Sequence, residues 1–193
     1  MNFLEKEYTG THFTKENSIE KNMKSKSFSR VIFDACDFTK SDFTGSRFLE
    51  CKFKGCNLSL VKLDGCRLQE VEFENSKLMG VSFAKCEQMF LSLGFKGCLI
   101  DTSNFSDLDL KGISFLECVI RETHFTSTNL TGADFSGSDL RGSVFHNSNL
   151  SKAHFERAIN YSISPLTNKL VKAHFSKPEV LSLLDHLGII IED

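Results

Sequence analysis

Large apolar side chains recur at every fifth position over most of this chain. The first uninterrupted run comprises Phe28, Phe33, Phe38, Phe43, Phe48, Phe53, Leu58, Leu63, Leu68, Phe73, Leu78 and Phe83. The second run comprises Phe95, Ile100, Phe105, Leu110, Phe115, Ile120, Phe125, Leu130, Phe135, Leu140, Phe145, Leu150 and Phe155. A period of five matches neither the 3.6 residues of an α-helical turn nor the two-residue period of a strand. The pattern therefore predicts a repeat architecture.

Each five-residue unit has the form small, polar, large, polar, polar, as in residues 41–45 (SDFTG) and 133–137 (ADFSG). We call the large residue central and the residue two positions earlier small; both are expected to point inward. If each unit turns the chain by a quarter, about twenty residues close a square coil, and coils stack at the spacing of paired strands, about 4.8 Å. The twenty-five units counted above then predict about six coils in an all-β solenoid, with the main β-helix over residues 28–160.

The two ends of the chain depart from the repeat. Residues 1–27 follow it weakly and are expected to form an N-terminal cap or a degenerate first coil. Over residues 161–193 the pattern decays into a coil remnant, a helix and a tail. Ser176 followed by Glu179 predicts a capping box for a short C-terminal α-helix over residues 177–187 that ends at Gly188.

The C-terminal helix and tail carry more apolar residues than one helix face can hold. This segment either caps the last coil or pairs with a second copy of the chain. We expect a homodimer interface formed by Val180, Leu183, Leu184, Leu187, Ile189 and Ile191.

The repeat is interrupted at residues 84–94. Phe83 and Phe95 are twelve residues apart, two more than two units, and Gln88 stands where a large apolar residue is due. Because a close-packed interior has no room for extra residues, the insertion must bulge outward. Phe90 can be either a core residue or the tip of this loop. The segment Met89, Phe90 and Leu91 is a candidate partner-binding loop, since exposed apolar patches mark contact sites; the alternative is an insertion without function.

Composition adds few candidate chemistries. The formal net charge is −2, and the chain has no apolar run near the length of a membrane span and no signal-peptide core, so we expect a cytoplasmic protein. All seven Cys occupy the small position of a unit, which indicates structural thiols. We expect the six His to be solvated, with no two of them stacked. Without a nucleophile and base, a phosphate loop or a metal constellation, we expect no enzyme activity and no cofactor.

Units such as Ala133-Asp134-Phe135 and Thr128-Asn129-Leu130 resemble the pentapeptide-repeat family, which implies a right-handed quadrilateral β-helix. The interruption and the tail, including residues 160–163 (NYSI) and 172–179 (KAHFSKPE), resemble its subgroup of Qnr-type quinolone-resistance and albicidin- and microcin-immunity proteins. This resemblance implies a rod-shaped dimer, joined through its C-terminal ends, that imitates duplex DNA. Such a protein binds DNA gyrase or topoisomerase IV and protects it from inhibitors, without contacting nucleic acid or membrane. The alternative is a generic interaction scaffold with an unrelated protein partner.

Duplex mimicry requires negative charge on the rod. When the units are counted in fours, the candidate acidic surface consists of Asp42, Asp64, Glu72, Glu74 and Asp107. Lysines on the same faces offset these carboxylates, so the sequence does not supply a strong acidic stripe along the whole rod. A local acidic site remains open.

Overall fold

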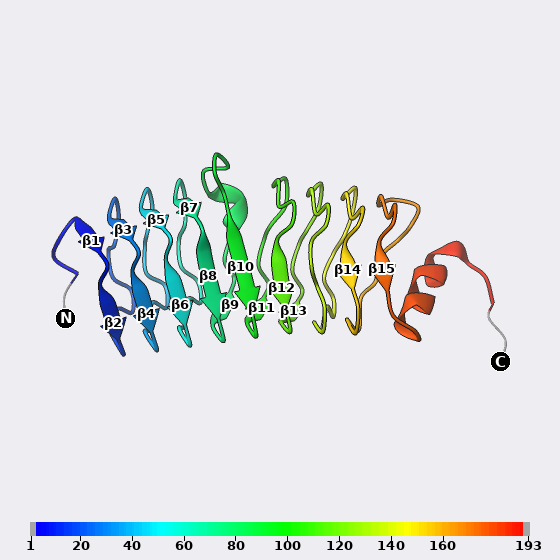
Figure 1. Ribbon diagram of the computed structural model, residues 1–193, viewed down its shortest axis with the longest axis horizontal. Helices are drawn as coiled ribbons and strands as arrows, with labels where there is room; N and C mark the ends of the chain where they lie inside the picture. The colour runs from blue at the N-terminus through cyan, green and yellow to red at the C-terminus, as the bar shows by residue number, and fades with distance from the viewer. Residues whose placement is uncertain (1–2, 191–193) are drawn as a thin grey trace.

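The computed structural model describes residues 3–190 and shows a rod of about eight stacked turns, with the N-terminal coils and the C-terminal helix at opposite ends (Figure 1). The all-β solenoid is confirmed. The estimate of six coils is too low, because residues on both sides of the two runs also form coils. Tyr8, Phe13 and Met23 take central positions before them, and Leu170 and Phe175 take such positions after them.

The coils pair through short parallel strands, which form one sheet on each of three faces. The first sheet contains β1 (Glu7–Thr9), β3 (Ser27–Ser29), β5 (Arg47–Leu49) and β7 (Arg67–Gln69). The second contains β2 (His12–Thr14), β4 (Ile32–Asp34), β6 (Lys52–Lys54), β8 (Val71–Glu74), β10 (Leu93–Lys96) and β12 (Ser114–Leu116), and β14 (His154–Phe155) and β15 (His174–Phe175) continue this face. The third contains β9 (Lys77–Met79), β11 (Leu99–Asp101) and β13 (Val119–Arg121). The fourth face is joined by single bridges such as Asn104 with His124.

The register of neighbouring coils is twenty residues on either side of the interruption, as for Phe33 opposite Phe53. Across the interruption it becomes twenty-two, with Phe73 opposite Phe95. The interruption is therefore a two-residue insertion that leaves every face in phase. A 3-10 turn, η1 (Phe83–Lys85), lies at its start.

The central residues form continuous stacks through the interior. Phe115 lies between Phe95 and Phe135, with ring centroids 5.0 and 5.1 Å away and nearly parallel ring planes. Phe105 and Phe125, from the neighbouring column, meet Phe115 edge to face. Each aromatic pair adds about 0.5–1.5 kcal/mol to the stabilisation from burial. The stacking of side chains across coils thus favours the same register as the backbone hydrogen bonds between the coils.

The small residues satisfy backbone carbonyls inside the rod. The thiol of Cys66 donates to the carbonyl of Phe43 at 2.9 Å, and the hydroxyl of Ser138 donates to that of Phe115 at 2.7 Å. The accepting carbonyl belongs in each case to the central residue of the preceding coil. All seven Cys are buried and free, as expected for structural thiols. Their role is to donate hydrogen bonds to inward-facing backbone carbonyls that are not paired between the parallel strands.

Most corners of the coil lie two residues after a central residue and adopt left-handed backbone. Gly112 has φ 72° there, but many corners carry side chains, for example Lys40 at 58° and Glu117 at 53°. A non-glycine residue in this conformation is strained by about 1–2 kcal/mol. The stacked core offsets this strain.

The last coils depart from the strict repeat. Asn160 and Pro165 occupy the counted central positions, but Tyr161 and Ile163 are the residues buried in the core. Ile163 pairs with Phe145, a register of eighteen residues, and the turn that follows restores the register of twenty by Lys169 opposite Asn149.

The C-terminal helix is a 3-10 helix, η2 (Glu179–Leu187), so the expected α-helix is wrong. The capping box is also wrong, because Pro178 is the N-cap and the hydroxyl of Ser176 accepts a hydrogen bond from the backbone N–H of Arg157. Gly188 ends the helix in left-handed conformation, as expected. A three-residue period aligns every third side chain. It therefore separates the surplus apolar residues into two rows, which no single α-helical face could do.

Replacing Gly112 by Ala should destabilise the protein by about 1 kcal/mol, because its space is open and only the left-handed backbone opposes a side chain. Gly94 supplies the matched control: its surroundings are equally open, and its φ lies outside the left-handed range. Gly94→Ala should be neutral or slightly stabilising. Urea unfolding of both variants measures the difference, and equal effects would show that the corners are not strained.

Candidate functional site

The inserted segment forms a loop whose base is held by the coils on both sides. The backbone N–H of Glu87 donates to the carbonyl of Cys66 at 2.8 Å, and that of Ser92 donates to the carbonyl of Leu68 at 3.0 Å. The Gln88 side chain reaches the carbonyl of Asp107 at 3.4 Å in the next coil. The loop thus leaves and re-enters the rod at fixed points.

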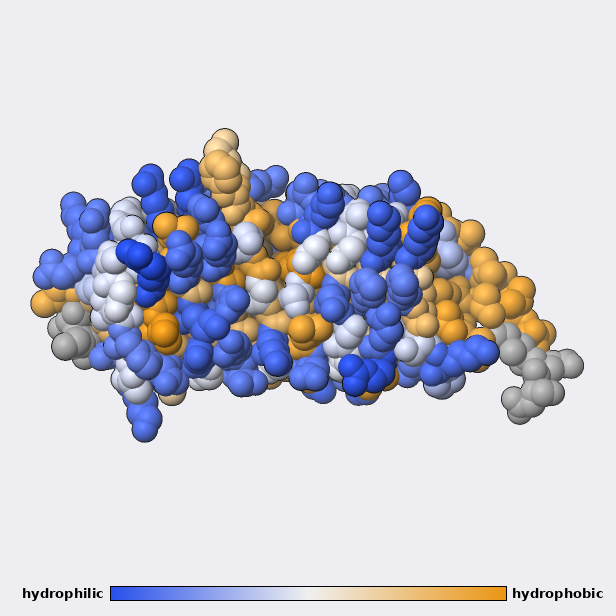
Figure 2. Space-filling view, viewed as in Figure 1, coloured by the Kyte–Doolittle hydropathy of each residue, from blue (hydrophilic) through white to orange (hydrophobic). Residues whose placement is uncertain are grey.

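The tip of the loop is apolar and exposed. Met89 is 66% exposed and Phe90 is 62% exposed, whereas Leu91 packs back against the core. Phe90 is therefore the loop tip and not a core residue. The loop rises above the rod near β8 and β10, and it forms an apolar projection among mostly polar side chains on the face shown (Figures 1 and 2).

The candidate acidic residues do not form a free anionic surface. Lys52 lies 2.6 Å from Glu72 and 3.1 Å from Glu74, and these two hydrogen bonds raise the pKa of Lys52. Asp42 pairs with Lys24 at 3.2 Å, and Asp64 pairs with Lys85 at 3.3 Å. Asp107 occupies a corner position on the same face as Asp42 and Asp64, with its carbonyl bound to Gln88. The pairings neutralise most of the charge that duplex mimicry would use.

The two apolar rows of η2 have different environments. Val180 and Leu183 lie half-buried on one row, and Leu183 packs against the core of the last coil. On the other row, Leu181 is 49% exposed and Leu187 is 45% exposed, with Leu184 half-buried between them.

The tail extends the exposed row with Ile189, which is 54% exposed, and Ile190. Leu181 and Ile190 belong to the surplus apolar residues of this segment but were not among the residues of the expected interface. Ile191, the last residue of the expected interface, lies outside the described residues. We call Leu181, Leu184, Leu187, Ile189 and Ile190 the terminal ridge; orange side chains gather at this end in Figure 2.

A third cluster was missed by the sequence reasoning. His154 and His174 are twenty residues apart and stack with ring centroids 4.5 Å apart, so the expectation that no two His stack is wrong. Glu156 contacts both imidazoles. Burial raises the pKa of Glu156, but hydrogen bonds from its own backbone N–H and from His154 outweigh this and lower it. The spacing of the two His in the sequence was the signal available.

Two surface hollows in the described part of the rod are small, and the larger, lined by Val71, Ser92 and Leu93, has a volume of about 230 Å³. The surface hollow beside Gly94, between Glu72, Phe95 and Ser114, has a volume of about 180 Å³, which is below the usual 300–1,000 Å³ of ligand pockets. None of the helices within residues 3–190 has the length and apolar character needed to cross a membrane.

The five-residue period, the inward pair of each unit and the four-faced coil define a solenoid of pentapeptide repeats. The family model described as "Pentapeptide repeat region" matches residues 26–104 and 88–159. The chain belongs to the pentapeptide-repeat family. No curated protein matches its sequence.

Two solved structures of QnrB1 share this fold. Two trypsin-treated forms of QnrB1, described as a plasmid-mediated fluoroquinolone resistance protein, align over 96% of this chain. The first has a TM-score of 0.60 and 17% sequence identity, and the alignment covers 100% of its length. The second has a TM-score of 0.70 and 15% sequence identity, and the alignment covers 97% of its length. HetL, a pentapeptide-repeat protein involved in heterocyst differentiation regulation in the cyanobacterium Nostoc, aligns over 88% of this chain and 83% of its own, with 18% identity and a TM-score of 0.30. At these identities the likeness concerns the fold.

Buried thiols give the protein a testable chemical signature. Burial raises the pKa of Cys51 to about 11 and that of Cys66 to about 12, from an ordinary value of 9.0. Because all seven thiols are buried, native protein at pH 8 should not react with a disulfide reagent, and all seven thiols should react after unfolding. Rapid reaction of the folded protein would contradict a structural role.

The same shifts predict a loss of stability at alkaline pH. The unfolded chain releases these protons from about pH 9, while the folded chain retains them, so the free energy of unfolding should fall as pH rises from about 9 towards 12. Urea unfolding between pH 8 and pH 11 measures this slope. Cys51→Ser combined with Cys66→Ser should flatten it, since a serine hydroxyl does not titrate there; an unchanged slope would contradict the assignment.

Proposed function

We propose that this protein binds a type II topoisomerase, DNA gyrase or topoisomerase IV, without enzymatic activity of its own and protects it from an inhibitor. The observation that carries the proposal is the apolar loop of Met89 and Phe90, held rigidly at its base on a rod that aligns with QnrB1 over 96% of the chain. QnrB1 is described as a fluoroquinolone resistance protein. The inhibitor class suggested for this chain is therefore a topoisomerase poison.

The proposed contact depends on shape and on the loop more than on charge. Eight turns at about 4.8 Å make a rod close to 40 Å long, which can lie in a groove shaped for duplex DNA. The ion pairs of Asp42, Asp64, Glu72 and Glu74 leave little free anionic charge for such mimicry. An exposed Phe beside a Met is the type of anchor on which interface affinity concentrates.

We also propose a homodimer joined through the terminal ridge. The apolar row at the end of the rod remains exposed to water, and self-association would bury it. A two-fold axis at this end would place the same ridge of both copies in contact, as in an isologous interface. Each dimer would then present two loops.

The neutralised acidic surface favours one alternative: a scaffold of the same fold that binds an unrelated protein through the same loop. The two functions differ in the partner and not in the binding surface. A topoisomerase assay therefore separates them.

Replacing Met89 and Phe90 together by Ala should raise the protein concentration needed to protect gyrase from a fluoroquinolone by at least about tenfold, since both anchors are lost. The measurement is DNA supercoiling by purified gyrase with the drug present. Because both side chains are exposed, the free energy of unfolding should change by less than about 0.5 kcal/mol.

The matched control is Ile19→Ala, which removes an exposed apolar side chain far from the loop. It should leave protection unchanged. Protection that survives the loop substitutions would contradict the proposed binding surface. If the unaltered protein neither binds nor protects gyrase or topoisomerase IV, the unrelated-partner alternative is supported.

Leu181→Glu combined with Leu187→Glu should convert a dimer into a monomer, because two carboxylates per chain cannot be buried in an apolar interface. Light scattering after size exclusion measures the mass. Leu166→Glu, at an exposed position in the turn before the last coil, is the control and should remain dimeric. A dimer that persists in the double variant would refute this interface.

A further inference from the structure

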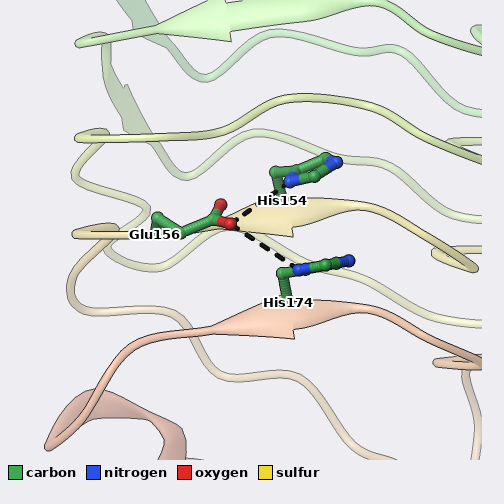
Figure 3. Close-up of side chains that lie close together, drawn as sticks. All are labelled: His154, Glu156 and His174. Atoms are coloured by element: carbon green, nitrogen blue, oxygen red, sulfur yellow. Dashed lines mark hydrogen bonds and ion pairs between the residues drawn. The ribbon is translucent and has the colours of Figure 1, made fainter.

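Three potential metal ligands converge on one face of the last two coils. Nδ1 of His154 lies 3.2 Å from Oε1 of Glu156, and Nδ1 of His174 lies 3.8 Å from the same oxygen. The three donor atoms all lie within 4.8 Å of one another. Figure 3 shows the two imidazoles extending from β14 and β15, with the Glu156 carboxylate directed toward both.

The solenoid fixes the positions of these ligands before any ion binds. His154 and His174 face each other in the parallel pair of β14 and β15, and the stacked rings of Phe155 and Phe175, with centroids 5.0 Å apart, hold this register from inside. Glu156 follows Phe155 just after the end of β14 and lies half-exposed on the outside of the coil, as His154 does. Its other oxygen, Oε2, lies 3.4 Å from the hydroxyl of Ser136 in the preceding coil. A carboxylate oriented by a second group is typical of built metal sites.

We propose that His154, Glu156 and His174 form a binding site for a divalent transition-metal cation, with zinc as the best chemical match. Two imidazoles and a carboxylate are one ligand set of tetrahedral zinc sites in which the protein supplies three ligands and water or substrate takes the fourth position. Ligands about 2.0–2.1 Å from a tetrahedral ion are separated by about 3.4 Å, so the observed distances need only small side-chain rotations. Imidazole nitrogens exclude Mg²⁺ and Ca²⁺ as the preferred ions, because these select oxygen ligands.

A bound ion would join the last two coils beside η2. Residues 154 and 156 belong to one coil and His174 to the next, so occupancy would link side chains of both coils in addition to their backbone hydrogen bonds. The free energy of metal binding would then stabilise the C-terminal end of the rod. This role is independent of the loop and of the proposed partner.

The other end of the same face provides a natural comparison. His12 precedes Phe13 as His154 precedes Phe155, and it pairs with Asp34 at 3.7 Å. Ile32 occupies the stacked position where a second imidazole would be required. One imidazole and one carboxylate should bind zinc far more weakly than the three ligands of the C-terminal cluster.

Isothermal titration of chelator-treated full-length protein with ZnCl₂ at pH 7.5 tests the site. The expected result is one zinc ion per chain, a raised melting temperature with Zn²⁺ and no shift with Mg²⁺. His174→Gln and Glu156→Gln should each weaken binding by at least about tenfold, the lower limit for losing even an outer-shell partner.

His12→Gln is the matched control and should bind zinc as the unaltered protein does. The melting temperatures of all variants without metal show whether each is folded, and the Gln replacements preserve size and polarity. The seven Cys remain in every variant, so zinc held by thiols would persist in His174→Gln. Persistence of binding in that variant, or no saturable binding by the unaltered protein below millimolar zinc, would overturn the proposal.

Discussion

The stacking of one large side chain on its equivalent in the preceding coil is the constraint on which the rest of the rod depends. Ring centroids in these columns lie 4.6 to 5.6 Å apart, close to the spacing that backbone pairing imposes on parallel strands, about 4.8 Å. Both requirements are satisfied only when each coil contributes the same number of residues to the interior. Any insertion must therefore leave the rod, as the segment around Met89 and Phe90 does, and the strained corners persist because the core over-determines them.

The same constraint organises the surface into columns. Outward residues at equivalent positions of successive coils lie side by side, so chemically useful groups meet through register and not through proximity in the sequence. Lys52 meets Glu72 in this way, and His154 meets His174. Flat faces of this kind favour extended protein contacts or ion pairs over enclosed pockets.

The end of a solenoid raises a separate problem, because its last coil exposes core and unpaired strand edges. Leu183 of η2 covers part of that core, and the three-residue period of η2 then leaves Leu181 and Leu187 on the outside. One structural element thereby covers the rod and presents an apolar surface. The cap and the proposed dimer interface consequently use different rows of the same helix.

Counting in fives is enough to predict the coil, the assignment of residues to faces, the structural role of the Cys and the site of the insertion. The details at which this count fails depend on packing in three dimensions. Phe90 lies five residues before Phe95, in the counted phase, yet it is exposed and Leu91 packs against the core instead. Tyr161 and Ile163 replace the counted positions because a shortened coil still has to fill the core. The ion pairs that neutralise Glu72 and Glu74, and the rows of η2, depend on side-chain conformation and helix period. A repeat count contains neither, since it specifies where a residue lies along the rod and not which neighbour it contacts.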